Sequence, residues 1–135
     1  MVDPAVAFGV PESHAGLLTQ PLVGVFTTIG VDGLPQSTAL WYLLDDGDLK
    51  ISVRSDRQKL KNLSANPRAA LFIFDPSTTL RTLEIRGDVE IHPDPDKREA
   101  ERFAASYGRA PSVWDPEGAT RSLLILRPHR IVTLG

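Results

Sequence analysis

The segment LVGVFTTIGVDGLPQSTALWYLLDDGDLKISV, residues 22–53, decides the fold class. Its first eight residues are mostly apolar, β-branched or aromatic, which is typical of a strand. Two Asp-Gly pairs, Asp32-Gly33 and Asp46-Gly47, then reverse the chain, because Asp-Gly is a strong hairpin signal. Strands are therefore expected at residues 22–29, 36–44 and 49–53. Joined by two tight turns, they predict an antiparallel meander.

Short helices are expected on both sides of this meander, at residues 11–18, 55–66 and 94–107. Ser55 and Gln58 have the spacing of a capping box, with Ser55 as the N-cap of the second helix. Asp94 or Asp96 is expected to cap the third helix. Gly108 stands where a left-handed residue commonly ends a helix.

Further strands are expected at residues 69–74, 83–91, 122–126 and 131–134. Apolar and charged residues alternate strictly over 83–91, and Gly87 lies in the apolar row, where a bulge or barrel bend requires it. Pro128 separates the last two strands or lies at a bulge. The pattern predicts one domain over residues 1–135. This domain is mainly β, an antiparallel closed or partly closed barrel of about six strands with two or three short helices.

The composition excludes several classes of protein. The chain has no cysteine, so disulfides and thiolate chemistry are absent. Its 15 basic and 17 acidic side chains give a net charge of −2, whereas a nucleic-acid binder normally has a basic excess. No apolar run approaches the roughly 20 residues of a membrane helix, and the N-terminus lacks a signal-peptide pattern. We expect a cytoplasmic protein that binds neither nucleic acid nor membrane.

The three histidines, His14, His92 and His129, are scattered and have no carboxylate at metal-ligand spacing. No metal site is predicted, and each histidine is interpreted as a surface or structural residue. The sequence also lacks a nucleophile elbow, a P-loop and a Rossmann glycine pattern. Any reactive group is therefore expected to come with a cofactor. Hydride transfer fits, because there the protein supplies binding, orientation and electrostatics.

The segment from Ser52 to Asn62 carries the clearest chemical signal. Four basic side chains surround the predicted helix start, namely Arg54, Arg57, Lys59 and Lys61. A helix N-terminus normally attracts acidic residues, so Arg57 and Lys59 oppose the local electrostatic preference. A bound anion would reverse this penalty, because backbone N–H groups and two cations would converge on it. The segment indicates a phosphate site, with a solvated basic face as the alternative.

The strand expected at 36–44 has apolar residues on both faces, so both faces are expected to be covered. One face belongs to the barrel core. The other face meets a partner subunit or the flat ring of a cofactor. For the Trp41-Tyr42 pair, core packing is the alternative explanation.

The order of these motifs resembles the pyridoxamine-5′-phosphate-oxidase-like, FMN-binding split-barrel superfamily, in particular its deazaflavin-dependent oxidoreductases, which use coenzyme F-420. The resemblance covers residues 22–134 and rests on an Asp-Gly-x-Pro-Gln turn, a Trp-Tyr strand, an Arg-x-Lys-x-x-Asn helix start, an LEIRG strand and Trp114-Asp115. It implies a homodimer whose cofactor groove lies between the subunits. The chain departs from its relatives at residues 79–82, where an aromatic residue is common, and at Ala39, where proline is common.

Carried over by position, the resemblance implies cofactor contacts from Arg57 and Lys59 at the phosphate, Asn62 and Ser52 beside it, and Thr38, Ala39, Leu40 and Trp41 along the ring. Arg54, Lys61 or Arg68 would hold a charged cofactor tail. The Trp114 region would close the site from the other subunit.

Three functions agree with these residues. The first is an F-420-dependent reductase that passes hydride to a small unsaturated or quinone-like substrate. The second is an FMN oxidoreductase or oxidase, whose phosphate would use the same Arg57–Lys59 pocket. The third is a non-catalytic flavin or haem carrier, for which His92 and His129, each beside a proline, are the candidate iron ligands.

Overall fold

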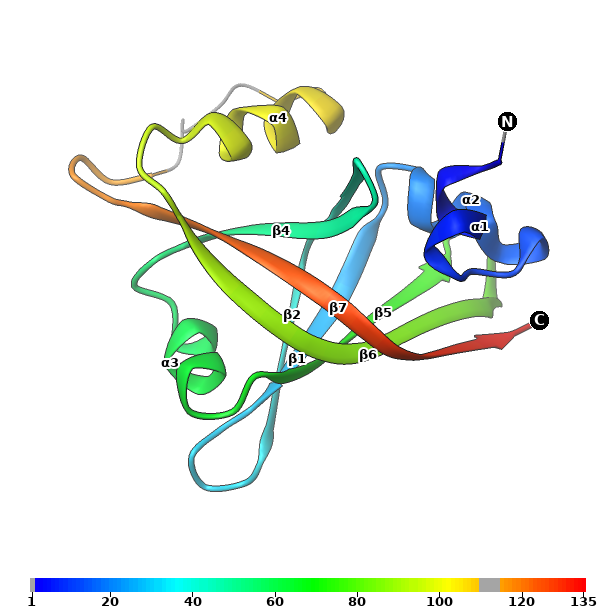
Figure 1. Cartoon of the computed structure of the whole chain (residues 1–135), viewed down its shortest axis with the longest axis horizontal. Helices are drawn as coiled ribbons and strands as arrows, with labels where there is room; N and C mark the ends of the chain where they lie inside the picture. The colour runs from blue at the N-terminus through cyan, green and yellow to red at the C-terminus, as the bar shows by residue number, and fades with distance from the viewer. Residues whose placement is uncertain (1, 110–114) are drawn as a thin grey trace.

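The computed structural model describes residues 2–109 and 115–135, which form seven strands, four short α-helices and one 3₁₀ turn (Figure 1). The strands are β1 (Val23–Ile29), β2 (Pro35–Trp41), β3 (Leu43–Asp45), β4 (Asp48–Arg54), β5 (Arg68–Asp75), β6 (Thr78–Asp94) and β7 (Arg121–Leu134). The helical elements are α1 (Pro4–Phe8), η1 (Glu12–His14), α2 (Ala15–Thr19), α3 (Gln58–Ala65) and α4 (Arg98–Ser106).

The seven strands form one antiparallel sheet in the order β2-β1-β5-β6-β7-β4-β3. Its two edges, β2 and β3, are consecutive in the chain and are separated only by Tyr42. The chain therefore passes from one edge of the sheet to the other within one residue, which rolls the sheet into a barrel (Figure 1). β2 and β4 are not paired, so the barrel is split between them. The predicted mainly β split barrel is confirmed.

Tyr42 fixes this crossing between the two edges. Its side chain is 1% exposed, and its hydroxyl donates to the carbonyl of Leu17, 2.6 Å away. Burial and the nearby Tyr107 raise the pKa of this phenol far above its usual range. The strand expected at 36–44 is therefore two strands, which pair with different neighbours.

The expected strands at 122–126 and 131–134 are in fact one strand, β7, interrupted by a bulge. β6 pairs Arg86 with Arg130 and Gly87 with Pro128, which leaves His129 as the extra residue. A Cβ at Gly87 would lie 1.9 Å from a backbone carbonyl oxygen of β7, so only glycine fits. The predicted bulge at Gly87 is confirmed, and Pro128 bends the strand without ending it.

The capping box predicted for α3 is wrong. The helix begins at Gln58 with Arg57 at the N-cap, and no side chain caps it. Ser55 is held elsewhere: its hydroxyl lies 2.9 Å from that of Ser122, and its N–H donates to Thr120. These contacts tie the turn before α3 to β7, so the N-cap lies at Arg57, two residues later than predicted.

The N-cap residue of α4 is Lys97 and not Asp94 or Asp96, and the helix starts at Arg98, later than predicted. Asp94 nevertheless caps the helix from the end of β6. The carboxylate of Asp94 accepts hydrogen bonds from the N–H groups of Glu99 at 3.3 Å and Ala100 at 3.1 Å. Gly108 has φ +67°, as expected after the helix end. At the N-terminus, the single predicted helix is divided into η1 and α2, and α1 was not predicted.

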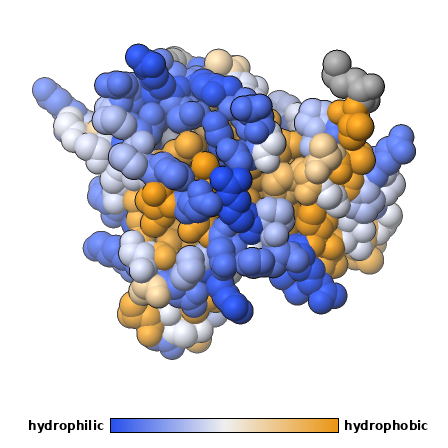
Figure 2. All heavy atoms as spheres, viewed as in Figure 1, coloured by the Kyte–Doolittle hydropathy of each residue, from blue (hydrophilic) through white to orange (hydrophobic). Residues whose placement is uncertain are grey.

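The main core lies inside the barrel, where the inner faces of the strands meet α1 and α2. A second cluster lies between α4 and the outer side of β7, formed by Phe103, Leu123 and Ile125 with Trp41 and Leu43 beside them. Ile91, expected on the apolar face of its strand, is 39% exposed. The surface in Figure 2 mixes polar and apolar areas. Among the described residues, no helix is long and apolar enough to span a membrane.

Candidate functional site

A cavity of about 200 Å³ lies at the start of α3, beside the split between β2 and β4. We call it the α3 pocket. It is lined by Leu40, Ser52, Val53, Arg54, Arg57, Lys59, Asp115 and Arg121. It therefore collects side chains from β2, β4, the first turn of α3 and the start of β7.

The positive charge of the α3 pocket is only partly compensated. Arg54 makes a bidentate salt bridge with Asp56, at 3.1 Å for both bonds. Arg57 and Lys59 have no ion pair or side-chain hydrogen bond within residues 2–109 and 115–135. Burial and the charge of Arg57 lower the pKa of Lys59. A lowered lysine pKa is the expected sign of a cation that lacks a counter-ion.

Ser52 adds an unsatisfied donor to these cations. Its hydroxyl oxygen is buried and has no hydrogen-bond partner in the described chain. A buried hydroxyl without a partner is unfavourable and calls for a ligand or a water molecule. No side chain caps α3, and the N–H of Leu60 donates to the Arg57 carbonyl at 3.1 Å, so the N–H groups of Gln58 and Lys59 are the ones left for an acceptor at this helix start. The pocket therefore fits a small oxyanion.

The sequence interpretation gave no site role to two charged residues of this pocket, Arg121 and Asp115. Arg121 donates through Nε at 2.8 Å and Nη2 at 2.6 Å to the two oxygens of Asp115. Lys97 lies 3.6 Å from the same carboxylate, whose side chain is 3% exposed. The hydrogen bonds from Arg121 lower the pKa of Asp115. Asp115 stands in the Trp114-Asp115 motif, but only tertiary structure brings it to α3.

Four of the eight residues expected at the cofactor line the α3 pocket: Leu40, Ser52, Arg57 and Lys59. The tail candidate Arg54 lines it as well. Asn62 does not line it. Its amide is 2% exposed and donates to Thr28 Oγ1 at 3.1 Å and Gln36 Oε1 at 3.0 Å. The structure thus places Asn62 as a buried link between α3 and the barrel.

The remaining candidates lie outside the pocket. Trp41 stacks on Tyr107 beneath α4, and Ala39 is exposed on β2. The Thr38 hydroxyl is buried and has no partner in the described part of the chain. The tail candidates also separate: Lys61 is exposed on α3, and Arg68 lines another groove. The position of Trp114 lies outside the described residues.

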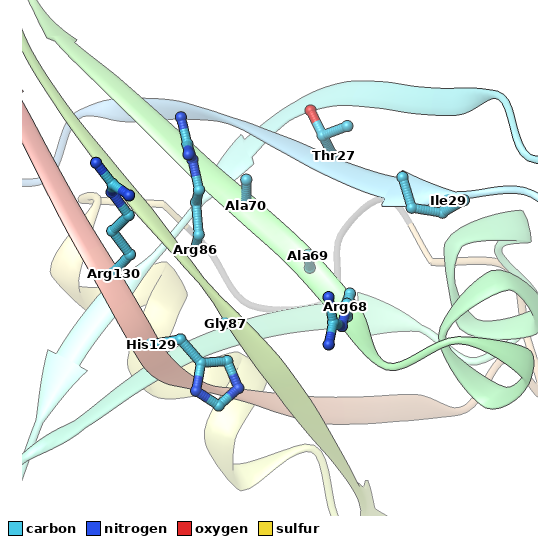
Figure 3. A pocket seen from close by; sticks show the side chains of 9 residues that line it. All are labelled: Thr27, Ile29, Arg68, Ala69, Ala70, Arg86, Gly87, His129 and Arg130. Carbon is cyan, nitrogen blue, oxygen red and sulfur yellow. The ribbon is translucent and has the colours of Figure 1, made fainter.

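That other groove is larger, about 540 Å³, and shares no lining residue with the α3 pocket (Figure 3). The smaller cavity is the better candidate for binding a small anion. It combines an uncapped helix start with two cations and a buried hydroxyl that have no partner in the described part of the chain, whereas the larger groove has a mainly apolar floor.

The described residues contain no cluster of three or more His, Cys, Asp or Glu suited to a metal. His14 is buried and bonded, with Nδ1 2.8 Å from Ser13 Oγ and Nε2 2.9 Å from the Leu134 carbonyl. His92 and His129 are exposed beside Glu90 and Asp88. The interpretation of the histidines as structural or surface residues is confirmed. The α3 pocket thus has no metal cluster of its own among the described residues, and what its side chains offer is binding and orientation of an anion.

Comparisons with known proteins agree with this fold. The family model described as pyridoxamine 5′-phosphate oxidase matches residues 10–135. A solved structure named F420 reductase is 35% identical, with a TM-score of 0.83, over 91% of this chain and 98% of that one. A conserved hypothetical protein, Rv2991 from Mycobacterium tuberculosis, is 24% identical, with a TM-score of 0.74, over 93% and 84% of the two chains.

A third structure, a putative pyridoxamine 5′-phosphate oxidase from Listeria innocua, shares 21% identity and the fold, with a TM-score of 0.68 over 91% of this chain and 96% of that one. No curated protein matches the sequence. The family model spans nearly all of the chain, and the F420 reductase structure agrees with it. The chain belongs to the pyridoxamine 5′-phosphate oxidase family of split-barrel proteins.

Proposed function

We propose that this protein is an oxidoreductase that binds coenzyme F-420 with its phosphate in the α3 pocket. One observation carries the proposal: Arg57 and Lys59, unpaired within the described residues, line the same cavity as the orphaned hydroxyl of Ser52. A phosphate oxygen would give that hydroxyl an acceptor and the two cations a counter-ion. The residues present therefore fit the group.

The identity of 35% to the F420 reductase structure supports the deazaflavin over FMN. Two further arginines line the pocket, Arg54 and Arg121, but each is already paired with a carboxylate, Asp56 and Asp115 respectively. When bound, such a cofactor supplies the hydride, and the protein binds it and orients it toward a small unsaturated or quinone-like substrate. FMN is the second candidate, because its phosphate would meet the same Ser52, Arg57 and Lys59.

We further propose that the protein is a homodimer. Val23, Phe72 and Phe74 are 51%, 37% and 38% exposed on the outer face of β1 and β5. The β1–β5 register aligns Val25 with Phe72, so these side chains form one apolar area. An apolar area of this kind favours association with a second copy. Size-exclusion chromatography with light scattering tests it, and a Phe72→Asp/Phe74→Asp variant should elute as a monomer.

The cofactor assignment is tested by equilibrium fluorescence titration with coenzyme F-420 and, in parallel, with FMN. We expect tighter binding of F-420, and a loss of about 100-fold in Arg57→Gln/Lys59→Gln, equivalent to about 2.8 kcal/mol. Lys61→Gln is the matched control, since Lys61 lies on the same helix outside the pocket. An unchanged affinity in the double variant would contradict the site.

The other outcomes decide among the alternatives. Tighter binding of FMN would move the protein to the flavin-dependent branch, and binding of neither cofactor would leave the haem-carrier function. Turnover separates an enzyme from a carrier. Mixing chemically reduced F-420, the protein and menadione should restore the absorbance of the oxidised deazaflavin faster than without protein.

A further inference from the structure

The groove of about 540 Å³ lies on the outer face of the barrel, across β1, β5, β6 and β7. We call it the outer groove. It is lined by Thr27, Ile29, Arg68, Ala69, Ala70, Arg86, Gly87, His129 and Arg130 (Figure 3). Its floor is made of small and apolar residues, and its rim carries three arginines. A cavity of this volume is within the usual range for small-ligand sites, about 300–1,000 Å³.

The bulge in β7 builds the cationic rim. With His129 inserted, Arg130 comes directly opposite Arg86 on the neighbouring strand. The two side chains leave the sheet from adjacent strands, as Figure 3 shows. Like charges directly opposite each other in an antiparallel pair are destabilising. Arg86 is compensated by Glu84, 2.6 Å away, whereas Arg130 has no side-chain partner among the described residues.

Arg68, at the start of β5, adds a second uncompensated charge. Its guanidinium also makes no bond to any residue within 2–109 or 115–135. Asp88, which the β5–β6 register places opposite Arg68, makes no ion pair with it: its Oδ2 contacts His129 at 2.8 Å, and its Oδ1 has no hydrogen-bond partner among the described residues. Within the described residues, the rim therefore presents Arg68 and Arg130 without an ion-pair partner above an apolar floor.

We propose that the outer groove binds a small organic anion with an apolar body, such as an aromatic carboxylate. The apolar body would lie on Ile29 and Ala70, and the carboxylate would accept bonds from the planar guanidinium groups, whose geometry matches it. Such a ligand would also relieve the Arg86–Arg130 repulsion. This site is additional to the proposed cofactor site, since the two cavities share no residue.

A second copy of the chain is a poorer occupant of the outer groove. In an isologous contact each residue near the axis meets its own counterpart, so a contact centred on the groove would set arginine against arginine. The apolar end of the same face, with Val23, Phe72 and Phe74, lies at the opposite ends of β1 and β5 and carries no such charge. The outer face thus divides into an apolar end and a cationic groove.

Isothermal titration calorimetry with 2-naphthoate tests the proposal, with 2-naphthamide as the neutral analogue of the same shape. We expect one naphthoate per chain and at least tenfold weaker binding of the amide. Arg68→Gln/Arg130→Gln should reduce naphthoate affinity to that of the amide. Arg109→Gln, at an exposed arginine outside the groove, is the matched control and should bind as the wild type does.

Arg57→Gln/Lys59→Gln separates this site from the α3 pocket and should leave naphthoate binding unchanged. Loss of binding in that variant, equal binding of acid and amide, or no binding to the wild type would overturn the proposal. If the groove double variant fails to fold, Arg68→Gln and Arg130→Gln are measured singly. Each should then weaken naphthoate binding at least threefold, and no weakening in either would overturn the proposal.

Discussion

The rings of Trp41 and Tyr107 stack almost parallel, with centroids 4.6 Å apart and planes inclined by 10°. The Tyr107 hydroxyl lies 2.7 Å from the Leu22 carbonyl and 2.9 Å from that of Tyr42, and it accepts the Tyr42 N–H at 3.1 Å. Tyr107 is the C-cap residue of α4. Its side chain therefore binds this helix to the point where the chain crosses between the sheet edges. Trp41 is held by α4 as part of that connection.

Removing the Tyr107 hydroxyl should destabilise the crossing while the stack remains. Tyr107→Phe is expected to lower the free energy of unfolding by about 1–2 kcal/mol, because backbone groups of Tyr42 lose a partner. Tyr107→Leu should cost more and should shift the emission of Trp41. Urea unfolding and fluorescence in a Trp114→Phe background measure both effects, since the chain has two tryptophans. Equal stability of Tyr107→Phe and wild type would contradict the role given to the hydroxyl.

Asn62 should matter for stability more than for binding. Asn62→Ala leaves the Thr28 and Gln36 side chains without their shared amide donor, and we expect a loss of about 2 kcal/mol in the free energy of unfolding. Affinity for F-420 should fall by less than in Arg57→Gln, because Asn62 does not line the α3 pocket. A selective loss of affinity at unchanged stability would instead support the contact implied by the family resemblance.

Anion binding in the α3 pocket should weaken at high pH. Burial and the charge of Arg57 lower the pKa of Lys59, and only the protonated amine attracts a phosphate. With phenyl phosphate as probe, whose charge is constant above pH about 8, affinity should decline as pH rises through the lowered pKa of Lys59. Lys59→Gln should bind more weakly and show no such decline. The same pH profile in both proteins would assign the titration to another group.

Asp115 should stabilise the folded protein at neutral pH and not in acid. Its pKa is lowered mainly by the hydrogen bonds from Arg121, so the folded state favours the ionised carboxylate. This contribution is present above its ordinary pKa of 3.8 and is lost as pH falls through the lower folded value. Asp115→Asn should therefore cost about 2 kcal/mol at pH 7 and progressively less toward pH 3. Urea unfolding across this range checks it, and a pH-independent difference would contradict it.

The bulge at Gly87 should not tolerate a side chain. A Cβ there would lie 1.9 Å from a backbone oxygen of β7, which cannot move without breaking the strand pairing. Gly87→Ala is expected to cost about 3 kcal/mol. Gly118→Ala, at φ +80° with open space around it, should cost only about 1 kcal/mol. Thermal unfolding of both variants measures the difference, and a similar cost would remove the steric argument.

Local chemistry in the sequence is enough to predict most elements of this fold. The Asp46-Gly47 turn adopts positive φ at both positions, as an Asp-Gly hairpin requires. The Asp94 cap is equally local, since it depends on groups within a few residues. Gly87 is visible in the alternating pattern of its strand, although the contact that requires a glycine there is with the distant carbonyl of Arg127. The Arg57-x-Lys59 pair likewise predicts an anion site without any tertiary information, because its charges oppose the helix start.

Only the tertiary structure decided where the second strand breaks, where α3 begins and what completes the site. Tyr42 divides β2 from β3 because Leu17 and Tyr107, far away in sequence, bind it there. Ser55 fails as a cap because Ser122 takes its hydroxyl. Asp115 and Arg121 enter the α3 pocket, and Arg130 comes opposite Arg86, through β7 pairings across the barrel. Such pairings depend on the register of distant strands, whereas turns and caps depend on neighbouring residues. Only turns and caps can therefore be predicted from the sequence alone.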